Sequence, residues 1–436
     1  GDAGIAALAI VAGLSTYAVH GLFNSYLGID KISLPFWIGL GALAALSRTA
    51  EDDRLEIELQ CALARSRTSA EGWGGERVHA AYRRALGLCR NLGDRNKELE
   101  VLSGLCTSLE TRGQLEEAAA LAREYVEAAE RHAHPVGLQM AHCAAFMVHF
   151  FQGHYFEAQK HAERVQIYHR QSEGEHALNV SALDPFVLTQ LYDSMCSWLR
   201  GQPDRGAQQS ARAIARARVL GHPFQLCHAL LNGSWVSVLR REHASALAQA
   251  DEALALAESV RILLFRGYGP LMLAPAFMTR EPSTATLERL EQCYQCMQAA
   301  NVRLHIPPYL CHIAQAYLQL GLPGEARPRI DLALDTMEST GERWIEPELL
   351  RVKAAVERAV DPDTDAGELI LSSALQKART AGARGFELRV ACDLCELLAP
   401  QGRESEGQEL VACVLATFSE GADTFDVQRA RGLLRT

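Results

Sequence analysis

The sequence lacks the short motifs that mark several common classes of enzyme. No glycine is followed by lysine, so the chain contains no Gly-x-x-x-x-Gly-Lys-Ser/Thr phosphate-binding loop. The His-Glu-x-x-His pattern of zinc proteases and the Gly-x-Ser-x-Gly pattern of serine hydrolases are missing as well. No pair of titratable residues stands at a spacing that supports catalysis. The sequence therefore predicts a protein that is not an enzyme and that uses no cofactor.

Aromatic residues and positive charge are also scarce. Phe, Trp and Tyr make up 7% of the residues, and the formal net charge is −10. A nucleic-acid-binding protein normally carries a surplus of basic residues, so nucleic acid is not an expected partner. Alanine and leucine are abundant, while runs rich in valine, isoleucine and threonine are few. Because alanine and leucine favour helix, the composition predicts an all-α fold.

The 12 cysteines show no spacing typical of a secreted disulfide framework, which predicts reduced thiols and a cytoplasmic protein. Two Cys-x-x-Cys pairs occur, at Cys293 and Cys296 and at Cys392 and Cys395. Both pairs fall on predicted helices about two repeats apart, where they are too distant to share one ion. We interpret them as buried thiols, with a metal or redox site as the alternative.

Short polar breaks interrupt the chain at intervals of about 40 residues, a period typical of helical repeat arrays. A second series of turns lies between them, so each repeat has the pattern helix, tight turn, helix, looser turn. One helix pair cannot bury its apolar stripe alone, and neighbouring pairs must therefore stack. The sequence predicts a right-handed superhelical solenoid of tetratricopeptide-like helix pairs. Its breaks are at Gly113, Gly153, Gly201, Arg241, Glu281, Gly321, Asp361 and Gly402.

The hydropathy pattern predicts three segments. Residues 1–50 form a hydrophobic helical hairpin, because residues 3–23 and 32–47 carry no formal charge. The first of these stretches is just long enough to cross a bilayer core of about 30 Å, so the hairpin is either a membrane anchor or a degenerate first repeat. Residues 51–417 form the solenoid. Residues 418–436 form a cap that includes a short helix with Asp423 as its N-cap.

Several segments resemble the C-terminal repeat region of large bacterial signalling proteins. In that family a nucleotide-cyclase or helix-turn-helix output domain is joined to an ATPase and then to such repeats. The resemblance implies a regulatory or sensory region, with an ATPase or cyclase domain of the same parent protein as one partner. A shorter resemblance, over residues 19–27 and 32–43, is to the closing membrane helices of O-antigen ligase-type proteins. It implies, alternatively, an accessory tail of a membrane glycan-handling protein. The segments that resemble the signalling family are 54–59, 184–204, 221–242, 340–349 and 418–433.

The predicted function is that of a non-catalytic scaffold that grips a protein or peptide on its concave face. First helices of each pair line that face in solenoids of this kind, and they supply most of the candidate contacts. Arg205, Arg212 and Arg216 form a basic strip on one second helix, which we interpret as a solvated face, with an acidic partner or anionic ligand as the alternative. The candidate contacts are Asp184, Tyr192, Arg212, Arg216, Asn232, Trp235, Tyr268, Tyr309, His312 and Glu348.

Histidines gather within one repeat. His142 and His149 are seven residues apart on one predicted helix, and His154 and His161 have the same separation on the next. We interpret them as structural residues in half-buried positions. The alternative is a weak metal site or a pH-sensing site.

Overall fold

The computed structural model describes residues 49–172, 183–260, 262, 264–362 and 364–435. The uncharged stretches 3–23 and 32–47 of the predicted hairpin lie outside the described residues. Among the helices that are described, none combines the length and apolar character needed to cross a membrane. The chain divides into two compact units, residues 1–112 and residues 113–436. Each unit is described separately below.

The described part of the first unit consists of α3 (Ala50–Glu71), α4 (Glu76–Leu92) and α5 (Arg95–Thr111). α3 begins with a capping box, in which Thr49 accepts a hydrogen bond from the Asp52 amide and the Asp52 carboxylate accepts one from the Thr49 amide. α4 packs against both α3 and α5. Gly104 in α5 lies directly against the Tyr82 ring, where a β-carbon would overlap the ring.

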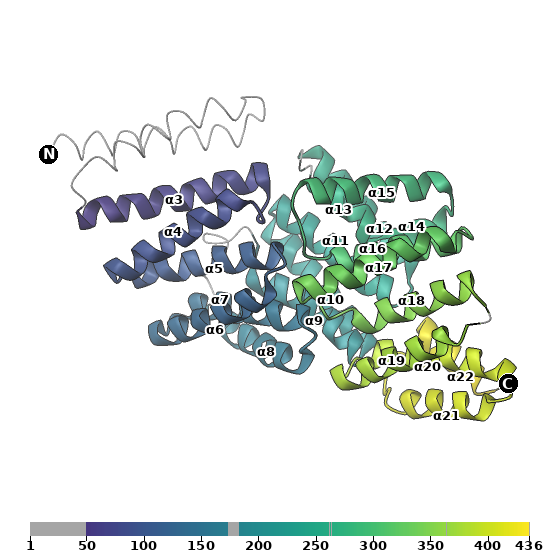
Figure 1. Cartoon of the computed structure of the whole chain (residues 1–436). Helices are drawn as coiled ribbons and strands as arrows, with labels where there is room; N and C mark the ends of the chain where they lie inside the picture. The colour runs from purple at the N-terminus through teal and green to yellow at the C-terminus, as the bar shows by residue number, and fades with distance from the viewer. Residues whose placement is uncertain (1–48, 173–182, 261, 263, 363, 436) are drawn as a thin grey trace. The chain divides into compact units, whose positions relative to one another are not determined.

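The second unit is built from consecutive antiparallel helix pairs (Figure 1). The predicted all-α solenoid of tetratricopeptide-like helix pairs is confirmed. Helices α10 and α17 each begin at a proline, a position where the missing amide proton is not needed. Its elements are α6 (Leu115–His132), α7 (Pro135–Phe151), α8 (Tyr155–Gln171), α9 (Pro185–Leu199), α10 (Pro203–Leu220), α11 (Pro223–Leu239), α12 (His243–Ser259), α13 (Leu264–Met272), α14 (Ala274–Arg280), α15 (Thr284–Ala299), α16 (Ile306–Gln319), α17 (Pro323–Thr340), α18 (Glu346–Val360), α19 (Ala366–Ala381), α20 (Arg384–Leu398), the 3-10 turn η2 (Ala399–Gln401), α21 (Glu404–Leu415) and α22 (Phe425–Leu433).

Two details depart from the simple pattern. The first helix of one repeat is broken into α13 and α14, with Pro270 inside α13 and a break at Leu273. The final helix α22 has Thr424 as its N-cap residue, so the expectation for Asp423 was wrong by one position.

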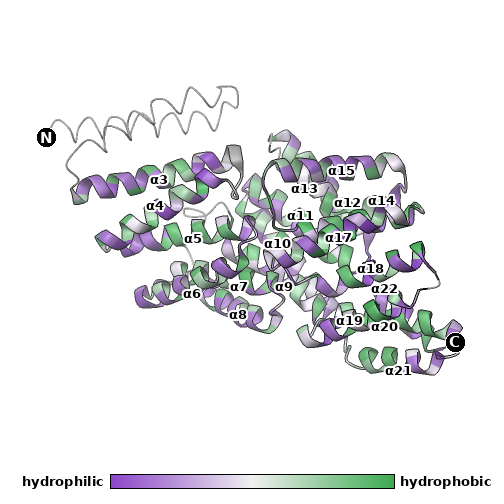
Figure 2. Cartoon of the chain, in the orientation of Figure 1, coloured by the Kyte–Doolittle hydropathy of each residue, from purple (hydrophilic) through white to green (hydrophobic). Residues whose placement is uncertain are grey.

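First and second helices of the pairs differ in burial. α9 and α11 have buried residues all round, whereas α12 buries only the alanine stripe of Ala246, Ala250, Ala253 and Ala257. Figure 2 shows a similar contrast between the largely hydrophobic α20 and the more hydrophilic α15. First helices therefore form an inner layer, and second helices form an outer layer with one face in solvent.

The second unit also closes on itself through contacts between distant repeats. The carbonyl of Phe151 accepts hydrogen bonds from the amides of Arg343 (2.8 Å) and Trp344 (3.1 Å). The Glu420 carboxylate accepts hydrogen bonds from two amides at the start of α10, at Asp204 (2.8 Å) and Arg205 (2.9 Å). These contacts curve the array tightly enough to bury most of its inner layer.

Candidate functional site

An aromatic cluster lies where the inner helices α7, α9, α11 and α16 meet the turn before α18. Neighbouring rings in it have centroids 5.1–6.3 Å apart, in both stacked and edge-to-face arrangements. Trp235 is central, because its ring contacts those of His305, Tyr309 and Trp344. We call this set the inner cluster: Phe150, Phe151, Tyr192, Trp235, His305, Tyr309 and Trp344.

Polar groups connect the rings of the inner cluster. The Tyr192 hydroxyl donates to the side-chain oxygen of Asn232 (3.1 Å) and lies 3.1 Å from Nε2 of His305. Tyr268 also hydrogen-bonds the Asn232 side chain. The Asn232 amide nitrogen in turn donates to the carbonyl of His228 (2.9 Å). One amide thus joins side chains from three successive inner helices, α9, α11 and α13.

Glu342 is the buried acid of this region. Its carboxyl group accepts hydrogen bonds from Nε1 of Trp344 (2.8 Å) and from the amide of His305 (2.8 Å). Burial raises the pKa of Glu342 to about 8. Burial, aided by nearby His228, lowers the pKa of His305 to about 3, so the imidazole is neutral at physiological pH. The cluster therefore combines aromatic rings with hydrogen-bonding groups that are neutral at physiological pH.

The structure brings half of the predicted contact residues together. Tyr192, Asn232, Trp235 and Tyr309 lie in or against the inner cluster and are buried, and Tyr268 adjoins them in a half-buried position. His228 and His305 are also half-buried, so the cluster has one edge that reaches the surface.

The other five predicted contact residues lie elsewhere, and four of them have structural partners. Asp184 caps α9 by accepting from the Val187 amide (3.0 Å), and it pairs with Arg216. Nδ1 of His312 lies 3.0 Å from the Leu271 carbonyl, and Glu348 belongs to a buried network of ion pairs. Arg212 is exposed on the outer helix α10. That these residues bind a partner stays a prediction.

Sequence reasoning missed five residues of this region: Phe150, Phe151, His305, Glu342 and Trp344. The missed signal lies in two turns. His305 directly precedes α16, which begins at Ile306, and Trp344 and Ile345 directly precede α18. These turns supply rings that a pattern of helix faces does not include.

The predicted histidine group converges between α7 and α8. Nδ1 of His142 lies 2.9 Å from Nδ1 of His161, and the His149 ring stacks on His161 with centroids 5.4 Å apart. Burial, with smaller contributions from neighbouring cations, lowers the pKa values of His142 and His161 to about 4. Within the described ranges, no group of three or more His, Cys, Asp or Glu residues is arranged to hold a metal ion.

The histidine pair predicts an acid-sensitive component of stability. Both imidazoles are neutral in the folded protein, while an unfolded histidine has a pKa of about 6.5, so their contribution is complete above pH 6.5 and is lost as pH falls toward 4. Burial is the main cause that disfavours protonation of the pair. The neighbouring His149 ring and the charges of Lys160 and Arg164 add to it, and Glu157 opposes it. Between pH 7 and pH 4.5, we expect the free energy of unfolding of the wild type to fall by about 2–3 kcal/mol more than that of a His142→Asn/His161→Asn variant. Urea unfolding at both pH values measures this difference, and parallel pH profiles would contradict it.

All four cysteines of the two pairs are free thiols on helices, but the prediction that they are buried is wrong for Cys293 and Cys296. Cys392 and Cys395 are buried, Cys293 is half-buried and Cys296 is exposed. Burial raises the pKa values of Cys293, Cys392 and Cys395, which disfavours the reactive thiolate.

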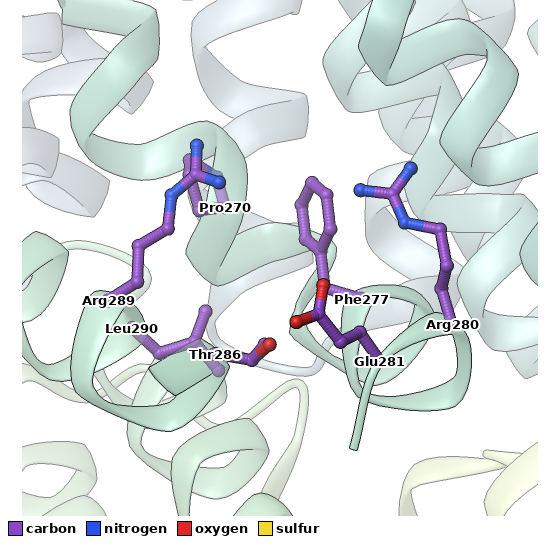
Figure 3. A pocket seen from close by; sticks show the side chains of 7 residues that line it. All are labelled: Pro270, Phe277, Arg280, Glu281, Thr286, Arg289 and Leu290. Carbon is purple, nitrogen blue, oxygen red and sulfur yellow. The ribbon is translucent and has the colours of Figure 1, made fainter. Parts of the chain in front are cut away.

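A small pocket of about 50 Å³ lies beside α13, α14 and α15 (Figure 3). The guanidinium groups of Arg280 and Arg289 lie 5.1 Å and 6.0 Å from the centre of the Phe277 ring. In Figure 3 the Glu281 carboxylate points into the space between the two arginines. The pocket is thus lined in part by charged side chains of both signs.

Comparison with known proteins shows the fold but no family. No protein-family model matches the sequence, and no curated protein matches it. Among solved structures, a Rap protein complexed with Competence and Sporulation Factor is similar with a TM-score of 0.59 and 10% identity, over 85% of this chain and 98% of that chain. The apo form of RapI is more distant, with a TM-score of 0.38 and 10% identity over 75% of this chain and 99% of that chain. Yeast Tom70 is also more distant, with a TM-score of 0.42 and 11% identity over 99% of this chain and 96% of that chain. Together with the paired helices, the likeness to the Rap protein identifies this chain as having a tetratricopeptide-like helical-repeat fold.

Proposed function

We propose that this protein is a non-catalytic interaction scaffold that binds an extended peptide segment at the half-buried edge of the inner cluster. The observation that carries the proposal is a row of hydrogen-bonding side chains that recur at the repeat interval on successive inner helices. Tyr192 and Asn232 are 40 residues apart and hydrogen-bonded, and Tyr268 and Tyr309 continue the row on the next two repeats. Such a row places hydrogen-bonding groups at repeat intervals along the inner helices.

The chemistry of the row favours a peptide as the occupant. Tyrosine and asparagine combine a flat or compact surface with donors and acceptors that match backbone amides. The neutral state of His305 and Glu342 avoids a buried net charge that would oppose an uncharged segment. The similar Rap structure contains a bound factor, which is consistent with this type of fold holding a partner.

A finer proposal concerns the setting of the scaffold. The sequence resemblance supports a cytoplasmic regulatory region of a bacterial signalling protein, with an ATPase or cyclase domain of the same parent as one partner. The coding sequence upstream of Gly1 tests this. A cyclase and a P-loop ATPase encoded there would support it, and a run of hydrophobic spans would instead favour the glycan-handling alternative.

The peptide proposal is tested by selecting linear peptides from a display library against the full chain. We expect the selected peptides to bind an Asn232→Ala/Tyr268→Ala variant about tenfold or more weakly, because central aromatic and hydrogen-bonding residues dominate interface energies. Gln208→Ala, an exposed position on outer helix α10, is the matched control and should bind like the wild type. Peptides that bind the Asn232→Ala/Tyr268→Ala variant as tightly as the Gln208→Ala control would show that the inner cluster is not the site.

A further inference from the structure

A second cleft, separate from the inner cluster, lies between α6, α7 and α8. It encloses about 200 Å³. Its floor is apolar and consists mainly of small side chains, among them Ala122, Ala145 and Val148. Cavities of about 150 Å³ hold a benzene-sized molecule, so this cleft has room for a small ligand with an apolar part.

One wall of the cleft carries imidazoles. His161 is already engaged by His142, as described above. His149 differs, because its Nδ1 atom is buried and has no hydrogen-bond partner in the described part of the chain. Burial, followed by the neighbouring His154 and Arg123, lowers the pKa of His149 against the opposing charge of Glu157. The ring is therefore neutral and offers one donor and one acceptor. An unpartnered ring nitrogen beside an apolar floor is a group that a ligand can satisfy.

The mouth of the cleft carries two opposite charges on one helix. Arg123 and Glu127 both line the cleft, both are exposed, and they are four residues apart on α6. Side chains at this spacing lie on the same face of a helix. Neither forms an ion pair with any residue of the described segments, although Arg123 is close enough to act electrostatically on His149. By contrast, Lys160 and Glu157 on the neighbouring α8 are paired at 2.8 Å.

We propose that this cleft binds a free apolar α-amino acid. The ligand carboxylate pairs with the guanidinium of Arg123 and hydrogen-bonds His149, while the ligand ammonium pairs with Glu127. The apolar side chain of the ligand packs against Ala122, Ala145 and Val148. A zwitterion is favoured over a simple carboxylic acid because it satisfies both unpaired charges, and the volume limits the side chain to about the size of leucine.

The test is calorimetric titration of the full chain with leucine and with two analogues that each lack one charge. These are 4-methylpentanoate, which lacks the ammonium group, and 3-methylbutylamine, which lacks the carboxylate. We expect leucine to bind and each analogue to bind about tenfold more weakly. Absence of heat with leucine, valine and phenylalanine at millimolar concentration would overturn the proposal, and so would equal affinity for leucine and 4-methylpentanoate.

Variants assign the binding to the cleft. Arg123→Gln and Glu127→Gln change exposed side chains and should each weaken leucine binding about tenfold without changing the circular dichroism spectrum. Ala122→Leu fills the floor and should abolish binding. Arg131→Gln, an exposed position on the same helix outside the cleft, is the control and should bind like the wild type. Unchanged leucine affinity in both Arg123→Gln and Glu127→Gln would refute the site even if Ala122→Leu fails to fold.

Discussion

Replacing Arg389 with alanine is expected to lower the free energy of unfolding of the second unit by about 3–5 kcal/mol. Arg389 is 5% exposed and lies at the centre of contacts that join distant repeats. Its guanidinium donates to Asp426 (2.9 Å), to Glu348 (3.4 Å) and to the Leu239 carbonyl. The same group lies 4.7 Å from the centre of the Trp198 ring.

The cost arises mainly from the carboxylates that remain. Burial favours the neutral form of Glu348, but the charges of Arg351 and Arg389 outweigh it and keep the pKa of Glu348 below its ordinary value. Without Arg389, Glu348 keeps Arg351, whereas Asp426 loses its 2.9 Å partner and keeps Arg241 at 3.2 Å. A buried carboxylate with fewer compensating charges is strongly destabilising.

Urea unfolding followed by circular dichroism measures the effect. The control is Arg218→Gln, which breaks the exposed ion pair with Glu252 and should change stability by less than about 1 kcal/mol. A similar small change for Arg389→Ala would show that the closing contacts of the second unit are not maintained by this network.

The second large effect is expected for Trp344→Ala, which should lower the free energy of unfolding by about 3–5 kcal/mol. Trp344 is fully buried, and its ring stacks on Phe150 and meets Trp235 edge to face. Its removal leaves a cavity at the junction of α7, α11 and the turn before α18. The carboxyl group of Glu342 also loses the 2.8 Å hydrogen bond from the indole, which adds the cost of a buried polar group with one partner fewer.

Phe156→Ala is the matched control for Trp344→Ala. Phe156 is 63% exposed on α8 and contacts solvent and Lys160 rather than the core. Its replacement should change stability by less than about 1 kcal/mol. Thermal unfolding of Trp344→Ala and Phe156→Ala measures the two effects. Equal shifts in melting temperature would mean that the inner cluster does not hold distant repeats together.

Local sequence pattern was a good guide to the repeats and a partial guide to the candidate site. The breaks at Gly113, Gly153 and Gly201 are turn residues with positive φ in the structure, a conformation that glycine adopts without strain. Likewise, the repeat pattern placed Tyr192 and Asn232 on predicted first helices, and the structure has them 40 residues apart on the neighbouring inner helices α9 and α11. Asp184 serves as the N-cap of α9, a role that periodicity cannot distinguish from that of an exposed contact residue.

The amino-acid sequence by itself determined the helices, their pairing and the 40-residue period, because these depend on interactions between residues close along the chain. Only the tertiary structure decided how tightly the array curves, and with it the burial of the inner layer. The amide of Trp344 donates to the carbonyl of Phe151 across almost half of the chain, and the amide of Gly421 donates to the Asp204 carboxylate over a similar separation. Such contacts depend on the total rotation that accumulates over several repeats, and the local periodicity of the sequence does not determine that rotation.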